Sequence, residues 1–309
     1  MKSFDVSVVV LTYCHEKYIA QTLNGIFSQL AKFKVEVLIC DDASMDNTNG
    51  EIENAIRGYQ GPFTVKSIRH PLNLGSKENG IYALRNCQGK YIAFCEGDDY
   101  WTDPYKLQKQ VDLMSKYPDL SLCAHNFDTI EDGNKLSERH CIKESNSSNA
   151  FEEITKTMLI QGNPLGTLSV LLRRDVIEDI PDWFKKSPFG DYALYFLAAS
   201  KGRLFRIPKC MGVYRKHAGG VHSPLHNEPK GLIKIWERHI LFYKLIRKNI
   251  KKSFTLNQDY MLYESVLKSY QNAIEVAKKE HYTYKYIILS FRLIFYKLIE
   301  RINNYIKNW

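Results

Sequence analysis

Three carboxylates within four residues end a short apolar run in the first third of the chain. The run 91–95 follows Gly89 and is rich in aromatic and aliphatic side chains, which is the pattern of a buried strand. Glu96, Asp98 and Asp99 come directly after it, and carboxylates this close repel one another unless a cation lies between them. Mg²⁺ and Mn²⁺ prefer oxygen ligands and also bind phosphate oxygens. The segment therefore predicts a metal–phosphate site, with an acidic surface turn as the alternative.

The elements that must position these carboxylates form an alternation of strands and helices. Continuous apolar strands separated by helices are typical of a parallel sheet that is covered by helices on both faces. We expect Ser76 to cap the third helix of this series. The strand and helix patterns alternate at 6–11, 18–30, 35–40, 46–56, 63–68, 76–84 and 91–95.

Polar side chains follow these strands where a ligand is expected. In an open α/β sheet the ligand binds at the carboxyl ends of the strands. Thr12 and Tyr13 follow the first strand, and Asp41 and Asp42 follow the second. We expect the acidic ends of the second and fourth strands to lie side by side. The sequence therefore predicts one site built from segments that are far apart along the chain.

The patterns after this region are shorter. Asp103 and Pro104 suit the cap and first turn of a helix. The polar stretch 131–150 is typical of a loop. Further strands and one helix are expected at 120–127, 168–172, 192–200, 204–207 and 211–214.

Six segments in this order resemble the family 2 glycosyltransferases. The resemblance implies a GT-A fold, which is a Rossmann-like α/β fold with a mostly parallel sheet that binds nucleotide diphosphate sugars. It covers roughly residues 4–220, an extent over which chance matches of short motifs become improbable. It also implies a nucleotide-binding half at 1–103 and an acceptor-binding half at 104–220. The segments are 8–13, 41–48, 73–75, 96–101, 190–191 and 214–217.

The resemblance implies roles for residues near the nucleotide. Thr12 and Tyr13 would line the nucleobase pocket, and Asp42 would accept a hydrogen bond from the imide of uracil. Asp41 would support that loop or reach the ribose. Arg85 stands where the family often has a basic residue near the donor. The implied donor is a nucleotide diphosphate sugar, with UDP as the expected nucleotide.

The resemblance also assigns the acidic strand end. Asp98 would contact the metal or the ribose, and Asp99 or Glu96 would complete the contact with metal and pyrophosphate. Glu96 stands where Asp is usual, which leaves open which of the three carboxylates bind Mn²⁺ or Mg²⁺. Contacts from 163–169 and from the loop 131–150 are expected to select the sugar.

The reacting groups of this chemistry come from the second half of the region. Asp191 matches the catalytic base of the family, although Gly190 replaces the more frequent Glu before it. By position, a helix cap is the alternative role of Asp191. Arg215 and His217 would close over the diphosphate as a lid. One base and in-line displacement imply inversion at the anomeric carbon. The resemblance implies transfer to the hydroxyl of a glycan or lipid-linked acceptor in surface polysaccharide synthesis.

The basic excess of the chain lies entirely in its C-terminal part. Residues 1–229 have 27 Lys and Arg against 28 Asp and Glu, whereas residues 230–309 have 16 against 6. This step, with the Pro- and His-containing stretch 217–229, predicts a catalytic domain at 1–220 and a helical region at 230–309.

Three helical patterns are visible in the C-terminal region, at 230–249, 259–279 and 286–306. The last pattern is amphipathic, aromatic and basic, which suits a helix lying on an anionic membrane surface. Packing on the catalytic domain and homodimer formation are the alternatives, because amphipathic periodicity is first of all a core signal.

Two other classes of protein share some of these features. A nucleotidyltransferase of similar fold normally has a glycine-rich basic loop after the first strand, but residues 12–16 contain no glycine. A basic nucleic-acid-binding protein needs its charge along a groove with exposed aromatic residues. Here the excess lies on short amphipathic helices and the predicted cleft is acidic, so we expect no nucleic-acid partner.

The sequence also suggests a location. The N-terminus has no signal-peptide pattern, and no uncharged apolar stretch is long enough to span a bilayer. The seven cysteines form no Cys-x-x-Cys pair, which favours free thiols in a reducing compartment. We therefore expect a cytoplasmic protein, peripheral on the inner face of the cell membrane if its helices bind lipid.

Overall fold

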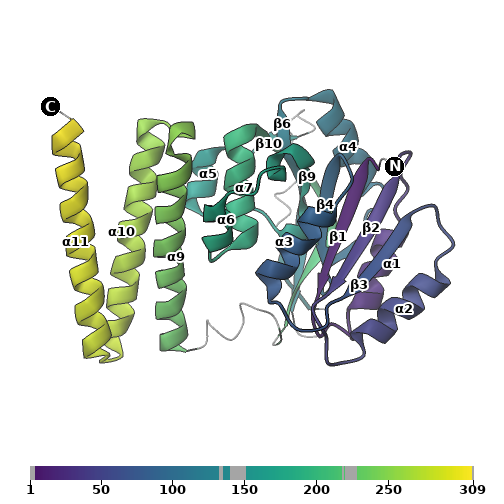
Figure 1. The fold of residues 1–309 in the computed structure, drawn as a ribbon, viewed down its shortest axis with the longest axis horizontal. Coiled ribbons are helices and arrows are strands. Elements are labelled where there is room, and N and C mark those ends of the chain that lie inside the picture. The colour runs from purple at the N-terminus through teal and green to yellow at the C-terminus, as the bar shows by residue number, and fades with distance from the viewer. Residues whose placement is uncertain (1–3, 132–134, 140–150, 218, 220–227, 308–309) are drawn as a thin grey trace. The chain divides into compact units, whose positions relative to one another are not determined.

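The computed structural model describes residues 4–131, 135–139, 151–217, 219 and 228–307. The chain divides into two compact units (Figure 1). The first unit comprises Met1–Lys185 and Gly190–Lys216, and the second comprises Lys186–Phe189 and His217–Trp309. The first unit thus ends at residue 216, whereas the sequence predicted a boundary between residues 220 and 230.

One mixed sheet forms the centre of the first unit. Its first four strands are parallel and buried except at the outer edge, as their continuous apolar sequences require. Their order in space is β3-β2-β1-β4, so the chain moves outward from β1 and then returns to its other side. α/β folds bind ligands at such a reversal, outside the carboxyl ends of the strands, which here are those of β1 and β4. The strands are β1 (Val6–Thr12), β2 (Val35–Asp41), β3 (Thr64–Arg69) and β4 (Tyr91–Glu96).

The register of β1 decides which polar residues are neighbours. Thr12 pairs with Asp41 of β2, and Leu11 pairs with Glu96 of β4. The two acidic strand ends therefore lie on either side of β1. The expectation that they would be adjacent was wrong, because strand order depends on the crossover between β3 and β4 and not on local sequence.

The remaining strands extend the sheet beyond β4 in the order β9-β6-β10-β5. β9 is antiparallel to both β4 and β6, whereas β10 is parallel to β6. β7, which pairs with β6, lies inside the stretch that was expected to be a loop; residues 132–134 and 140–150 of that stretch lie outside the described residues. These strands are β5 (Tyr100–Trp101), β6 (Leu120–Glu131), β7 (Lys135–Arg139), β8 (Glu152–Glu153), β9 (Leu171–Arg173) and β10 (Arg203–Lys216).

Two predicted strands differ from the observed ones. A single strand, β10, replaces the two expected at 204–207 and 211–214, and its pairing with β6 is irregular between Ile207 and Val213. Pro208 lies in this interval and has no N–H to donate, so the apolar pattern is interrupted while the strand continues. Cys210, in the same interval, is disulfide-bonded, which corrects the expectation of free thiols for this residue.

Helices cover both faces of the sheet (Figure 1). Right-handed crossovers place α1 and α2 on one face, and α3 lies on the other because the chain reverses direction before β4. Two predicted helix starts were wrong: Gly75, with φ of 85°, precedes a helix in which Ser76 is already helical, and Tyr105 rather than Asp103 precedes α4. The α-helices are α1 (Ile19–Phe27), α2 (Thr48–Gly58), α3 (Ser76–Asn86), α4 (Lys106–Lys116), α5 (Lys156–Gln161), α6 (Asp182–Lys186) and α7 (Gly190–Lys201), with 3₁₀ turns at Thr167–Ser169 and Arg174–Ile177.

The second unit contains three long helices, α9 (Pro229–Ile250), α10 (Leu256–Lys279) and α11 (Thr283–Lys307), with a 3₁₀ turn at Lys251–Ser253. Arg247 of α9 joins them, because it forms ion pairs with Asp259 of α10 and Glu300 of α11, both at 2.8 Å. A capping box at Thr255 and Gln258 begins α10. No described helix is long and apolar enough to cross a membrane.

The packing of α1 gives a stability prediction. An ideal Cβ at Gly25 would lie 2.7 Å from the backbone oxygen of Trp101 in β5, so we expect Gly25→Ala to lower the free energy of unfolding by about 1 to 3 kcal/mol. Gly58→Ala is the matched control, because a Cβ there meets nothing within 4 Å and Ala should stabilise α2 by about 0.5 to 1 kcal/mol. Urea denaturation measures both. Equal changes of the same sign would contradict the close approach of α1 to Trp101.

Candidate active site

The acidic turn after β4 gathers three carboxylates. Glu96, Asp98 and Asp99 each offer an oxygen within 4.8 Å of the others. Asp99 is fully buried, and its Oδ1 accepts a hydrogen bond from the backbone N–H of Arg215 at 2.9 Å. Its Oδ2 is also buried and has no hydrogen-bond partner among the described residues. A buried carboxylate oxygen without a donor calls for an explanation, and a bound cation would supply one.

The electrostatics of the turn point to a cation. Burial, followed by repulsion from Asp98 and Glu96, raises the pKa of Asp99 well above its ordinary value. Burial, followed by repulsion from Asp98 and Asp191, raises the pKa of Glu96 to about 8. A divalent cation would replace this repulsion with attraction, and three carboxylate oxygens suit Mg²⁺ or Mn²⁺. The residues present therefore fit such an ion.

The backbone of the acidic turn is held from α1 and β1. The hydroxyl of Thr22, buried in α1, lies 2.9 Å from the carbonyl oxygen of Gly97 and 2.6 Å from that of Asp99. The N–H of Gly97 donates to the carbonyl of Leu11 at 2.8 Å. Only glycine fits at position 97, because a Cβ would lie 2.5 Å from Oγ1 of Thr12. These contacts position the carboxylates.

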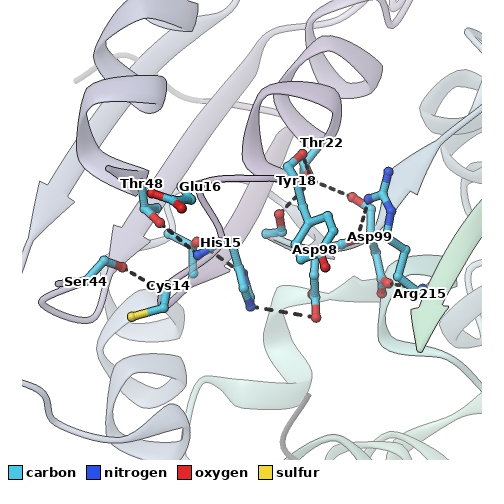
Figure 2. Close-up of polar contacts among 12 residues, drawn as sticks. Cys14, His15, Glu16, Tyr18, Thr22, Ser44, Thr48, Asp98, Asp99 and Arg215 are labelled. Carbon is cyan, nitrogen blue, oxygen red and sulfur yellow. Dashed lines mark hydrogen bonds and ion pairs between the residues drawn. The ribbon is translucent and has the colours of Figure 1, made fainter. Parts of the chain in front are cut away.

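Arg215, at the end of β10, holds the same turn from the other side. Its Nη1 donates to the carbonyl oxygen of Asp98 at 2.5 Å, and its Nη2 donates to Gln21 of α1. The guanidinium lies 5.1 Å from the ring centroid of Tyr18 and 4.6 Å from that of Tyr100, within cation–π range of both. Figure 2 shows Arg215 beside Asp99. In this arrangement Arg215 orders the turn and brings positive charge next to it.

The loops after β1 and β2 are joined by hydrogen bonds. The N–H of Cys14 donates to Ser44, and the N–H of His15 donates to Thr48, both at 2.8 Å (Figure 2). Cys14 and Ala43 have φ values of 56° and 59°, which are unusual for residues other than glycine. Strained backbone of this kind persists where the surrounding contacts enforce it, and it often occurs at functional sites.

The predicted nucleobase residues come together at the ends of β1 and β2. Asp41 is fully buried and accepts hydrogen bonds from the hydroxyl and N–H of Ser44, so it supports the loop. The carboxylate of Asp42 accepts from the N–H groups of Leu74 and Gly75, at 2.7 and 2.9 Å. The side chain of Tyr13 is 39% exposed, so its ring is accessible for stacking.

Asp191 lies in the first turn of α7. Its Oδ2 accepts a hydrogen bond from Nδ2 of Asn163 at 3.2 Å. Its charge raises the pKa of Glu96 and contributes, after burial and the three carboxylates of the turn, to the raised pKa of Tyr214. The fold therefore brings a carboxylate from the second half of the first unit into the electrostatic range of the acidic turn.

One predicted residue, Arg85, is not gathered with the others. Arg85 is exposed in the last turn of α3, which leads to the start of β4 and so lies at the opposite edge of the sheet. Arg69, at the end of β3, is a basic residue that does lie at the carboxyl edge of the sheet. Its Nε lies 3.5 Å from Oδ2 of Asp41. His217 directly follows β10 and begins the second unit.

Several residues that shape the site had no role predicted from the sequence. Nε2 of His15 lies 3.7 Å from Oδ2 of Asp98, and its position after the first strand was a usable signal (Figure 2). Arg69 also ends a strand and could have been found in the same way. Thr22 and Gln21 had no signal, because their contacts join a helix to residues far along the chain.

The family comparison agrees with this geometry. The model of glycosyl transferase family 2 matches residues 7–180, more than half of the chain, so the chain belongs to this family of glycosyltransferases. An uncharacterized protein of Mycobacterium tuberculosis is 34% identical over 240 residues, which are 75% of this chain and 64% of the relative. The chain therefore spans less than two thirds of that relative. The Escherichia coli glucosyltransferase WfaP is 28% identical over 233 residues, which are 74% of this chain and 83% of that protein.

Solved structures support the fold. Staphylococcus aureus TarS, residues 1–349 with UDP-GlcNAc, has a TM-score of 0.56 at 17% identity, covering 89% of this chain and 83% of that one. A mannosyltransferase of Pyrobaculum calidifontis with GDP-Man and Mn²⁺ has a TM-score of 0.60 at 13% identity, covering 99% and 85%. The predicted family and the GT-A fold with C-terminal helices are confirmed, and the family assignment favours a glycosyltransferase over the two alternative classes.

Proposed function

We propose that this protein is an inverting, metal-dependent glycosyltransferase that moves a sugar from a nucleotide diphosphate sugar to an acceptor hydroxyl. The observation that carries the proposal is the gathering of the acidic turn and the ends of β1 and β2 at one edge of the sheet, within electrostatic range of Asp191. These groups match the parts of the reaction: a pocket for the nucleotide, a site for the diphosphate and a base.

The nucleotide would lie across the ends of β1 and β2. Tyr13 would stack on the base, with Thr12 beside it, and the Asp42 carboxylate would accept a hydrogen bond from the imide N–H of uracil. Asp41 keeps the loop in place through Ser44. UDP is the proposed nucleotide, because WfaP is named as a glucosyltransferase that uses UDP-Glc.

The diphosphate would lie at the acidic turn. Glu96, Asp98 and Asp99 would hold Mn²⁺ or Mg²⁺, which when bound neutralises the charge that develops on the departing diphosphate. Arg215 keeps the turn ordered through the carbonyl oxygen of Asp98. We retain His217 as a proposed diphosphate contact, whereas the position of Arg85 makes it a poor candidate.

Asp191 would act as the general base. It would take the proton of the acceptor hydroxyl while that oxygen attacks the anomeric carbon from the face opposite the diphosphate, which inverts the configuration. The amide of Asn163 orients the carboxylate for this role. The proposed acceptor is a glycan on a lipid carrier, since WfaP is named for a diphosphoundecaprenol-linked acceptor.

A thermal-shift panel tests the donor site. The purified chain is heated with UDP, GDP, CDP or dTDP, each with Mn²⁺ or with EDTA. At a ligand concentration of about 100 times Kd, binding adds about 2.7 kcal/mol, so we expect UDP with Mn²⁺ to raise Tm by several degrees. Asp42→Ala should remove most of this shift. A shift with GDP only would contradict the UDP proposal, and no shift with any nucleotide would contradict the site.

A further inference from the structure

One face of α11 carries large apolar side chains that the described residues leave exposed. Their exposed fractions range from 39% to 79%. Five of them recur at alternating intervals of three and four residues, which places them in one stripe along the helix. The set, called here the α11 face, is Tyr284, Ile287, Phe291, Ile294, Phe295, Leu298 and Ile299.

The opposite side of α11 is already used for packing within the unit. Leu289 is fully buried, and the hydroxyl of Tyr296 accepts a hydrogen bond from Arg247 of α9. Glu300 pairs with the same arginine at 2.8 Å. The α11 face is therefore a second apolar surface that the three-helix packing does not need. An apolar patch of this size on a protein surface usually marks an interaction site.

The charges beside the α11 face identify the chemistry of its partner. Helix α11 contains five Lys and Arg but one acidic residue, Glu300, which is paired with Arg247. Lys285 and Arg292 lie near one carboxylate, Glu237, and Arg292 remains strongly exposed. Apolar side chains bordered by cations are what an anionic lipid surface attracts, because the rings enter the interface while the cations meet the phosphates.

The same charges disfavour a second copy of this chain. A symmetric pairing of two α11 faces would bring like cations together, with no unpaired carboxylate on the described part of α11 to compensate for them. No described helix could span a bilayer, so binding to lipid would be at its surface. We propose that the α11 face binds an anionic membrane surface, with α11 lying in the plane of the interface.

Vesicle co-sedimentation tests this proposal without requiring catalysis. The full chain is mixed, at low and at high salt, with vesicles of pure phosphatidylcholine or with vesicles that also contain about 30% phosphatidylglycerol. The phosphatidylglycerol gives the vesicle surface a negative potential. We expect binding to the anionic vesicles, weaker binding at high salt, and little binding to phosphatidylcholine. Phe291→Ser with Phe295→Ser should weaken binding by about 10-fold or more, since both rings leave the interface.

A matched control separates the α11 face from exposed apolar residues in general. Leu256→Ser with Tyr260→Ser removes two exposed apolar side chains of α10, and this variant should bind like the unchanged chain. Unaltered circular dichroism and Tm show that each variant is folded. Equal loss in both double variants, or no preference for anionic vesicles, would overturn the proposal. A dimer in light scattering that the α11 variant converts to a monomer would instead assign the face to a second copy.

Discussion

Replacing Asp191 by Asn is expected to lower kcat by about 10²- to 10⁴-fold, while the affinity for UDP with Mn²⁺ stays unchanged. An amide of the same shape keeps the hydrogen bond with Asn163 but cannot take a proton, so only the base is removed. Steady-state kinetics with the donor established by the thermal-shift panel, together with titration calorimetry of UDP, measure the two quantities separately.

Two further variants bracket the effect of Asp191→Asn. Asp182→Asn neutralises a carboxylate of the same half of the chain that is 85% exposed on α6, and it should leave kcat unchanged. Asn163→Ala removes one hydrogen bond of Asp191 and keeps its carboxylate, so a smaller loss of about 3- to 10-fold is expected, the cost of one hydrogen bond. Normal turnover in Asp191→Asn would refute the assignment of the base, and loss of UDP binding would make its role structural.

The second large effect is expected from Asp99→Asn, with opposite signs in the presence and absence of metal. The variant removes a carboxylate oxygen that has no partner among the described residues. We therefore expect Mn²⁺-dependent UDP binding to weaken by more than about 100-fold. Loss of a residue that contacts only the metal ligands typically costs about 10- to 100-fold. Without metal, the same change removes the cost of burying this carboxyl beside two others, and the free energy of unfolding should rise by roughly 1 to 3 kcal/mol.

The metal-free protein should also lose stability as pH rises. A carboxyl whose pKa is raised on folding holds its proton more tightly in the folded state, so its contribution is present below the unfolded pKa and is lost as pH rises through the folded value. For Glu96 that window runs from its ordinary value of 4.5 to about 8. Added Mn²⁺ should oppose this loss, because it binds the ionised carboxylates. Urea denaturation at several pH values, with EDTA or Mn²⁺, measures the effect.

Asp103→Asn is the control for these measurements. Asp103 lies just after the acidic turn, but Lys109 and Lys209 pair with it at 2.5 and 2.7 Å and lower its pKa to about 2. Its neutralisation should destabilise the protein and leave the Mn²⁺ dependence of UDP binding intact. Two results would contradict the electrostatic account of the acidic turn. One is a metal-free protein that Asp103→Asn stabilises, and the other is a metal-free protein that Asp99→Asn destabilises.

The strands and helices were largely predictable because their signals are local. The four apolar runs correspond to β1–β4 within about one residue at each end, and the helices between them were also expected. Helix starts were less accurate, since Ser76 and Asp103 are good caps by type but the chain turns into the helix elsewhere. Residues 204–214 were divided in two because Pro208 breaks the apolar pattern without ending β10.

The candidate site was predictable to the extent that strand ends are predictable. Thr12, Asp41, Asp42 and the acidic turn were found because carboxyl ends of parallel strands share one edge. Arg85 was misplaced for the converse reason: it ends a helix, and the helix returns to the opposite edge. The contacts of Thr22 and Gln21 with the acidic turn and Arg215 join residues that are 75 to 194 positions apart. No local pattern contains that information.

Residue types and their spacing were sufficient to predict an acidic metal–phosphate site at the end of a buried strand, and the family resemblance then predicted that this site belongs to a nucleotide-sugar pocket. That was possible because hydrophobic periodicity and the affinity of carboxylates for hard cations are local properties. The fold added the order β3-β2-β1-β4, which puts Thr12 between the two acidic strand ends, and the orientation of Arg215 toward the backbone of the turn. Those features depend on contacts between segments that are far apart in the sequence. The contacts form, and contribute to stability, only when the chain has folded.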